Sequence, residues 1–68
     1  MSLRALITGA NGFVGRLLAK HLEARGWQVV RTDVAGAGDV VACDVSDPGQ
    51  VRAMLEQAGP VSHIFHLA

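Results

Sequence analysis

The chain has 68 residues, half of them apolar, and equal numbers of acidic and basic side chains give it a formal net charge of zero. This length allows one small domain, its single cysteine (Cys43) excludes an internal disulfide, and no Cys/His spacing indicates a metal site. The absence of basic runs, of long apolar stretches and of a signal-peptide pattern argues against nucleic-acid binding, membrane association and secretion, so we expect a cytoplasmic protein.

The first feature in chain order is an apolar run followed by three glycines. Residues Leu3–Thr8 have the pattern of a buried parallel strand, and Gly9, Gly12 and Gly15 follow at intervals of three. Residues without Cβ let the backbone turn sharply and approach a ligand closely, and the first amides of a following helix face an anion. The stretch therefore predicts a pyrophosphate cradle, with Gly-x-x-Gly-x-x-Gly spacing instead of Gly-x-Gly-x-x-Gly.

The next segment, from Phe13 to Arg25, has the periodicity of a helix that packs on a sheet. The side expected to face the sheet carries Phe13, Val14, Leu17, Leu18, Leu22 and Ala24. The opposite, polar side carries Arg16, Lys20 and Glu23. Gly15 borders the apolar side, where it lets helix and strand approach closely. His21 falls within the apolar side and is expected to be a partly buried core residue, and Gly26 suits the C-terminal cap.

A second strand, Gln28–Thr32, leads to Asp33 and is rich in β-branched residues. Only a short segment separates Asp33 from the next apolar run, Val40–Cys43, whereas a helical crossover between parallel strands takes about a dozen residues. We therefore expect an irregular loop over residues 34–38 and a third strand that ends in a small buried residue, Cys43.

The residues around Asp47 have the pattern of a helix start. Asp47 is expected to be the N-cap, Pro48 the first helical residue and Gln50 the partner in a capping box. Gly59 and Pro60 end this helix. Its apolar side is expected to carry Val51, Met54, Leu55 and Ala58. Its outer side is expected to carry Arg52, Glu56 and Gln57. Residues 61–68 form the last strand.

This order of elements predicts an α/β fold, the N-terminal half of a Rossmann-type doubly wound parallel sheet with strand order 3-2-1-4. The two helices should lie on opposite faces. The fourth strand would form an apolar edge without a partner, which in complete domains is covered. We therefore expect residues 1–68 to be the N-terminal part of a single Rossmann domain whose remainder, with the substrate lobe, is absent.

With these motifs identified, the chain resembles the extended short-chain dehydrogenase/reductase family, and within it the NAD-dependent epimerase/dehydratase group. Residues Thr8–Gly15 (T-G-A-N-G-F-V-G) match its glycine motif, and Asp33 matches its acid after the second strand. Asp44-Val45 matches its adenine-side pair, and His66-Leu67-Ala68 matches the start of its H-L-A-A strand end. The match covers the whole chain but only the N-terminal part of a typical member.

The resemblance implies a cofactor site and no metal. The expected cofactor-binding residues are Gly9, Asn11, Gly12, Phe13, Val14, Gly15, Asp33, Asp44, Val45, Leu67 and Ala68. Asp33 lies close to the spacing of about 20 residues at which an acid binds the adenosine ribose, and the family's contact for Asp44 is the adenine amino group. Leu67 and Ala68 are assigned to packing near the nicotinamide ribose. Two alternatives remain: Asp33 as a turn acid without a ligand, and Asp44 as a cap before Asp47.

The charge of Asp33 favours NAD over NADP, because a 2′-phosphate would meet a like charge. Arg16 and Arg31 act in the other direction, since either could reach a phosphate. On a helix and on a strand, however, we expect both to be solvated.

The family transfers hydride with the help of a Tyr, a Lys four residues later and a Ser or Thr. The chain has no tyrosine, and its only lysine is Lys20. We therefore expect no catalytic residue here, with His63 and His66 packing on the sheet. The parent is expected to be an NAD-dependent epimerase, dehydratase or related oxidoreductase acting on a nucleotide-sugar-like hydroxyl or carbonyl substrate, and members often dimerise. The alternative is a non-catalytic NAD(P)-binding sensor or partner-binding protein of the same fold.

Overall fold

The computed structural model describes residues 3–36 and 38–68. These residues contain β1 (Arg4–Thr8), α1 (Phe13–Ala24), β2 (Gln28–Asp33), β3 (Val40–Ala42), α2 (Pro48–Ala58) and β4 (His63–His66). The elements follow the predicted order, and most bounds differ from the prediction by a single residue at most. The expected loop over residues 34–38 connects β2 to β3 without a helix in its described part, and its residue 37 lies outside the described residues.

The strands form one parallel sheet in the order β3-β2-β1-β4, as predicted. In the central strand, Leu6 pairs with Val30 of β2 and Ile64 of β4. The last strand is shorter than residues 61–68, because its partner β1 ends at Thr8, where the chain turns into α1. Beyond His66, the amide of Leu67 still donates to the carbonyl of Thr8 at 3.2 Å, at the end of β1.

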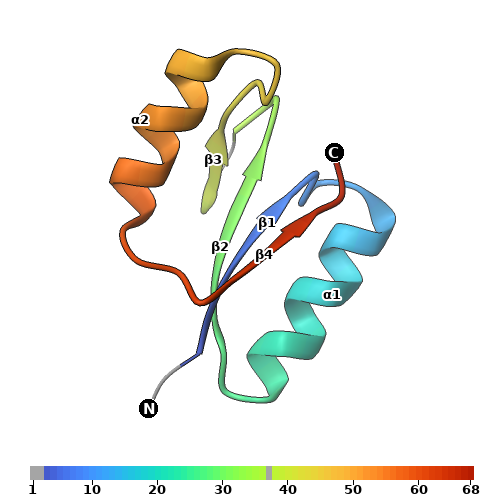
Figure 1. Cartoon of the computed structure of the whole chain (residues 1–68). Coiled ribbons are helices and arrows are strands. Elements are labelled where there is room, and N and C mark those ends of the chain that lie inside the picture. The colour runs from blue at the N-terminus through green and yellow to red at the C-terminus, as the bar shows by residue number, and fades with distance from the viewer. Residues whose placement is uncertain (1–2, 37) are drawn as a thin grey trace.

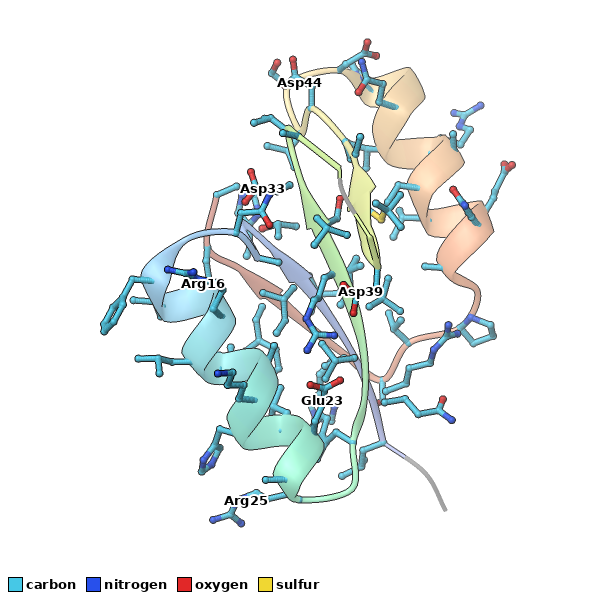
Figure 2. The ribbon with its side chains drawn as sticks, turned by 180° about the vertical axis from the view of Figure 1, so that it is seen from behind. Arg16, Glu23, Arg25, Asp33, Asp39 and Asp44 are labelled. Carbon is cyan, nitrogen blue, oxygen red and sulfur yellow. The ribbon has the colours of Figure 1, made fainter. Side chains whose placement is uncertain are left out.

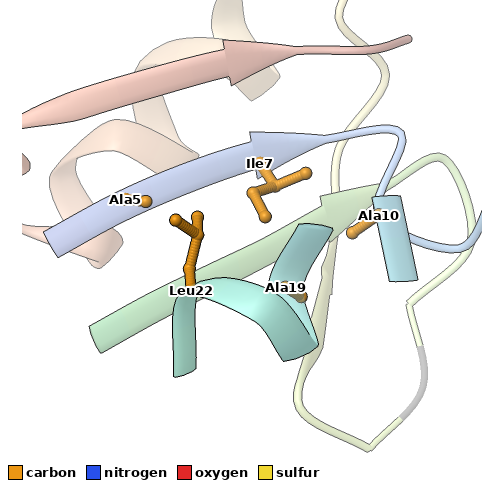
Figure 3. Close-up of a cluster of buried hydrophobic side chains, with 5 residues drawn as sticks. All are labelled: Ala5, Ile7, Ala10, Ala19 and Leu22. Carbon is orange, nitrogen blue, oxygen red and sulfur yellow. The ribbon is translucent and has the colours of Figure 1, made fainter. Parts of the chain in front are cut away.

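The two helices cover opposite faces of the sheet (Figure 1). Successive residues of a strand point to opposite faces, so β1 contributes to two cores. Ala5 and Ile7 pack with Ala10, Ala19 and Leu22 on the α1 side (Figure 3). Leu6 packs with Cys43 and Met54 on the α2 side, which confirms Cys43 as a small buried residue.

The prediction of which residues of α1 face the sheet is wrong in part. Phe13, Val14 and Leu17 are 72%, 60% and 53% exposed, and Ala24 is exposed as well. The buried residues of α1 are Gly15, Ala19 and Leu22. Gly15 decides this orientation, because a Cβ built on it would lie 2.5 Å from the carbonyl oxygen of Gly9. With Gly15 against the backbone, the helical period brings residues 19 and 22 inward and turns the bulkier residues of the first turn outward.

His21 is likewise exposed and not part of the core. It lies one turn before Arg25, whose Nε donates a hydrogen bond to His21 Nε2 at 3.1 Å. Gly26 follows the end of α1 with a φ of +86°, and its amide bonds to the carbonyl of Glu23. It thus has the left-handed conformation that a glycine adopts after a helix, as predicted.

The start of α2 confirms the predicted cap. Asp47 Oδ1 accepts hydrogen bonds from the amides of Gly49 (3.0 Å) and Gln50 (3.3 Å), with Pro48 in the first turn. The predicted capping box is wrong in its second half: the amide of Asp47 donates to the carbonyl of Asp44 at 3.0 Å, and Gln50 Oε1 accepts instead from the amide of Asp44 at 2.8 Å. On the expected inner side Met54 and Ala58 are buried, whereas Leu55 is 41% exposed. No strand pairs with the outer edge of β4 among the described residues, so Leu55 lies beside an open part of the sheet.

Candidate functional site

The segments that follow the strands meet at one edge of the sheet, because parallel strands all end there. The glycine turn follows β1, Asp33 ends β2, Asp44 and Val45 follow β3, and residues 67–68 follow β4. Figure 1 shows the C-terminal residues beside the turn between β1 and α1. The structure therefore brings the predicted site residues from four segments to a single edge.

The turn between β1 and α1 is packed against the end of β4. Gly9 has a φ of +70°, and a Cβ on it would lie 2.9 Å from the amide nitrogen of Ala68. Any other residue here would be strained and would displace the chain after β4. Gly9 and Gly15 are thus both required by backbone contacts within the segment itself.

Gly12 differs from the other two glycines of the motif. Its φ of −72° is open to any residue, and a Cβ on it would contact only the carbonyl oxygen of Gly9 at 3.4 Å. A Cβ at Gly12 would therefore fit within the turn, unlike a Cβ at Gly9. As the N-cap of α1, Gly12 provides no side-chain hydrogen bond, and the first turn contains no acid. The N-terminus of α1 consequently presents amides that no side chain caps.

Asp33 binds to the glycine turn. Its Oδ2 accepts a hydrogen bond from the amide of Asn11 at 2.8 Å, and its Oδ1 accepts one from the amide of Val34 at 2.7 Å. Asn11 completes the connection, since its Nδ2 donates to the carbonyl of Ala35 at 2.9 Å. A carboxylate accepts about four hydrogen bonds, so these two leave acceptor capacity at both oxygens. The contacts are those of a turn acid, and the ribose contact stays a prediction.

Thr8 contributes a set of contacts that the sequence motifs did not identify. Its buried Oγ1 accepts hydrogen bonds from the amides of Leu67 (3.0 Å) and Ala68 (3.4 Å) and lies 2.7 Å from His66 Nδ1. The Thr8 side chain thus joins both backbone amides and the His66 ring at the end of β4. The sequence signal for these contacts was the hydroxyl residue at the end of the central strand. This hydroxyl holds the segment after β4 against Gly9.

The two histidines of β4 lie at opposite ends of the strand. The ring of His63 lies 4.9 Å from that of Trp27 and 6.5 Å from that of Phe65, between centroids. His66 is held by Thr8. Both contacts agree with the expected packing role on the sheet.

Asp44 caps the segment that precedes α2. Its Oδ1 accepts hydrogen bonds from the amide (3.0 Å) and the hydroxyl (2.6 Å) of Ser46, and these bonds lower the pKa of the exposed carboxyl. The capping alternative thus describes the contacts present, and the adenine contact stays a prediction. Val45, next to it, is 38% exposed and lines an apolar hollow of about 230 Å³ with Thr8, Ile64 and His66.

The expected solvation of Arg31 is wrong, whereas Arg16 is exposed as predicted. The Arg31 side chain is only 18% exposed and pairs with Glu23 of α1 and, at 3.4 Å, with Asp39 before β3. The hydrogen bond and the charge of Glu23, together with Asp39, raise the pKa of Arg31 against the effect of burial. Strand position alone did not indicate this pairing, because Glu23 and Arg31 lie on different elements.

Other kinds of site find no support among residues 3–36 and 38–68. The described side chains include no group of three or more His, Cys, Asp or Glu residues that could hold a metal ion. None of the described helices is long and apolar enough to cross a membrane.

Residues 5–68 match the model of the NAD dependent epimerase/dehydratase family. The chain belongs to this family. This confirms the resemblance that the motifs indicated and, with the observed strand order, the Rossmann-type, NAD(P)-binding fold.

Two known proteins are similar to this chain over most of its length. A solved structure titled "Mutated Uronate Dehydrogenase" matches with a TM-score of 0.67 and 29% identity, over 98% of this chain and 26% of that one. The phenolphthiocerol synthesis polyketide synthase type I Pks15/1 of Mycobacterium marinum (strain ATCC BAA-535 / M) is 34% identical over 87 aligned positions, 93% of this chain and 4% of that protein. The chain thus spans about a quarter of the dehydrogenase and a small part of the synthase.

Proposed function

We propose that this segment binds the NAD cofactor of an NAD-dependent epimerase, dehydratase or related oxidoreductase. The observation that carries the proposal is the N-terminus of α1: an uncapped helix start, without an acid, reached by a glycine turn that leaves no room for a Cβ at Gly9 or Gly15. A pyrophosphate matches such amides, since the helix dipole and the free N–H groups both favour an anion.

In the proposed complex each segment at the sheet edge has a separate task. Residues 9–15, with Asn11, Phe13 and Val14, hold the pyrophosphate, and Asp33 accepts hydrogen bonds from the adenosine ribose through its remaining acceptor capacity. Asp44 and Val45 face the adenine. Leu67 and Ala68, held by Thr8, pack near the nicotinamide ribose. When bound, NAD supplies a hydride acceptor, and these residues orient it.

We further propose that residues 1–68 are the N-terminal part of a single NAD(P)-binding Rossmann domain. The chain contains no tyrosine, so the Tyr and Lys that move a substrate proton belong to another part of the protein. The proposed substrate is a nucleotide-sugar or a similar compound with a hydroxyl or carbonyl group, and the proposed assembly is a homodimer. The open apolar edge at β4, where Ile64 is 58% exposed, supports a larger domain in which this edge is covered.

Gly12→Val in the full-length protein tests the cofactor site. The structure has room for a Cβ at this position, so we expect the fold to persist, while the valine side chain would cover the amides that we assign to the pyrophosphate. We expect loss of NAD binding by calorimetry with an unchanged circular dichroism spectrum. Gly49→Val, which introduces the same side chain in the first turn of α2, is the control. Unchanged NAD affinity in Gly12→Val would refute the proposal.

A further inference from the structure

Thr8 and His66 form a side-chain pair at the ends of β1 and β4. The two residues are partners in the parallel register, and Thr8 Oγ1 lies 2.7 Å from His66 Nδ1. Both side chains line the apolar hollow on the α2 side of the sheet, together with Val45 and Ile64. Thr8 is buried, whereas His66 is exposed. The histidine can therefore exchange a proton with solvent while it contacts a buried hydroxyl.

Three groups approach the Thr8 hydroxyl. Besides the ring of His66, the amides of Leu67 and Ala68 donate to Oγ1, at 3.0 Å and 3.4 Å. A hydroxyl offers one proton and two lone pairs. If its proton is directed to Nδ1, both lone pairs are left for the two amides, and every group of the set has a partner. This arrangement requires an uncharged ring whose Nδ1 carries no proton.

A protonated His66 ring changes this balance. Both nitrogens of a cationic imidazole carry protons, so Nδ1 becomes a third donor directed at Thr8 Oγ1. Two lone pairs cannot accept three donors with good geometry, and the Thr8 proton loses its acceptor. The amide of Ala68 is the most easily displaced, because its bond of 3.4 Å is the longest of the three. Leu67 has a second acceptor, the carbonyl of Thr8 at 3.2 Å.

A displacement of Ala68 would extend to the glycine turn. A Cβ on Gly9 would lie 2.9 Å from the amide nitrogen of Ala68 and 2.9 Å from the carbonyl carbon of Leu67, so the two backbones are in close contact. In the proposed complex, residues 67–68 lie near the nicotinamide ribose, and Gly9 begins the turn that holds the pyrophosphate. The charge of the His66 ring therefore affects two parts of the proposed cofactor site.

The described residues place no acid against the His66 ring. The side chains that share its hollow from β1, from the segment after β3 and from α2 are uncharged besides Thr8: Leu6, Val45, Val51, Met54 and Leu55. Asp33 and Asp44 lie at the same end of the sheet (Figure 2), but Asp33 accepts from two backbone amides and Asp44 accepts from Ser46. No salt bridge involves His66 within residues 3–36 and 38–68. This part of the protein thus provides no charged partner that would hold a protonated ring in place.

We propose that His66 is a positioning residue: its uncharged ring, through the Thr8 hydroxyl, holds residues 67–68 in the conformation that binds the dinucleotide, and protonation of the ring loosens them. The inference rests on the proposed cofactor site. Because NAD binding and protonation then oppose each other, NAD affinity falls as the pH is lowered, and NAD binding expels a proton from the ring. Histidine ordinarily changes its charge between about pH 5 and pH 8, so the effect falls within this range.

The experiment measures the Kd of the full-length protein for NAD by calorimetry, between about pH 5 and pH 8. We expect the Kd of the wild type to rise about fivefold toward low pH, as for the net loss of one hydrogen bond. His66→Asn and His66→Leu cannot gain a proton, so their Kd should change less with pH. The amide oxygen of Asn can accept the Thr8 proton, so His66→Asn should bind NAD more tightly than His66→Leu.

Two further comparisons test whether the effect passes through Thr8. His63→Asn, at the other end of β4, is the matched control, since His63 contacts Trp27 and Ser62 and should not influence the pH dependence. Thr8→Ser keeps the hydroxyl and should keep the pH dependence, whereas Thr8→Val should reduce it. Titrations in buffers of different ionisation enthalpy should show that the wild type releases more protons on binding NAD than His66→Asn does. Circular dichroism at each pH checks that every variant is folded.

The outcomes separate the role of His66 from the proposed function. If NAD binds but its affinity depends on pH equally in the wild type and in His66→Asn, the positioning role is wrong while the cofactor site stands. If the wild type binds no NAD at any pH in this range, the proposed function and the inference are both wrong. An equal loss of pH dependence in His63→Asn would also overturn the inference. A pH dependence that is lost in His66→Asn and kept in His63→Asn and Thr8→Ser would support it.

Discussion

The two helices of this segment begin in opposite ways. The first turn of α2 is closed by its own chain, since the Asp47 carboxylate accepts from two amides. The first turn of α1 begins at Gly12, with no side-chain cap and no acid. A glycine at the N-cap, without a side-chain hydrogen bond, gives up roughly a few tenths of a kcal/mol relative to a capping Ser, Thr, Asn or Asp. The comparison shows where the chain leaves an anion site open and where it fills one with its own carboxylate.

The largest expected effect is on stability, when a side chain at Gly15 prevents the close approach of α1 to the glycine turn. In Gly15→Ala the new Cβ would lie 2.5 Å from the carbonyl oxygen of Gly9 and 2.8 Å from Cα of Ala10, and backbone atoms cannot move aside cheaply. We expect the free energy of unfolding to fall by about 3 kcal/mol, as in an overpacked core. Urea denaturation measures this change, and Gly12→Ala, where a Cβ has room, should stay near the wild type.

Removing the acid beside the open helix start should weaken cofactor binding. Asp33→Ala eliminates the proposed ribose contact and also the acceptor for the amide of Asn11. We expect NAD binding to lose about 1.5–3 kcal/mol and the difference between NAD and NADP to narrow. Calorimetric titration with both dinucleotides checks this. Equal affinity for NAD in the wild type and in Asp33→Ala would contradict the assignment of Asp33.

Loss of the cap at the N-terminus of α2 should lower the stability of the protein and have little effect on cofactor binding. Asp47→Ala removes the acceptor of the amides of Gly49 and Gln50, and we expect the free energy of unfolding to fall by about 1 kcal/mol. NAD affinity should fall far less than in Gly12→Val, because the Asp47 carboxylate caps α2 and is not among the groups that we assign to the cofactor. A loss of NAD affinity comparable to that of Gly12→Val would show that the two helix starts do not differ as proposed.

The smallest effect concerns pH. The bonds from Ser46 lower the pKa of Asp44 below that of an unfolded aspartate. A lowered pKa means that the carboxylate stabilises the fold above the unfolded pKa, near 4, and that this contribution is lost as the pH falls through the folded pKa. Asp44→Asn should therefore reduce the acid-side slope of stability against pH slightly. Urea denaturation at pH values from about 2 to about 6, a range that brackets the pKa of an unfolded aspartate, measures this slope.

How well each feature could be predicted from sequence depended on how far apart the interacting residues lie. The Asp47 cap joins residues two and three positions apart, so the residue types alone indicated it. Thr8 contacts residues about 60 positions away, and a hydroxyl residue at the end of a strand does not indicate which distant segment it contacts. Arg31 and Glu23 lie on separate elements, and their ion pair arises only when α1 packs across β2.

The rotation of α1 shows the limit of periodicity. Apolar residues at positions 13, 14, 17, 18 and 22 define a broad arc, and an arc of this width permits several orientations on a sheet. The contact of Gly15 with the backbone of residues 9 and 10 selects one orientation, and it exposes Phe13 and Val14. The periodicity of apolar residues takes account of side chains alone. It gives no weight to Gly15, which is buried because it has no side chain.

The sequence by itself determined the order of the elements, the parallel sheet with strand order 3-2-1-4, the glycine turn and the family. Each depends on local residue types and on the length of the connections, including the segment after Asp33 that is too short for a helix. Only the tertiary structure decided which side of α1 meets the sheet, that Thr8 holds the end of β4, and that Arg31 pairs with Glu23. Contacts between distant segments depend on angles and distances of packing, and no pattern within a single segment encodes them.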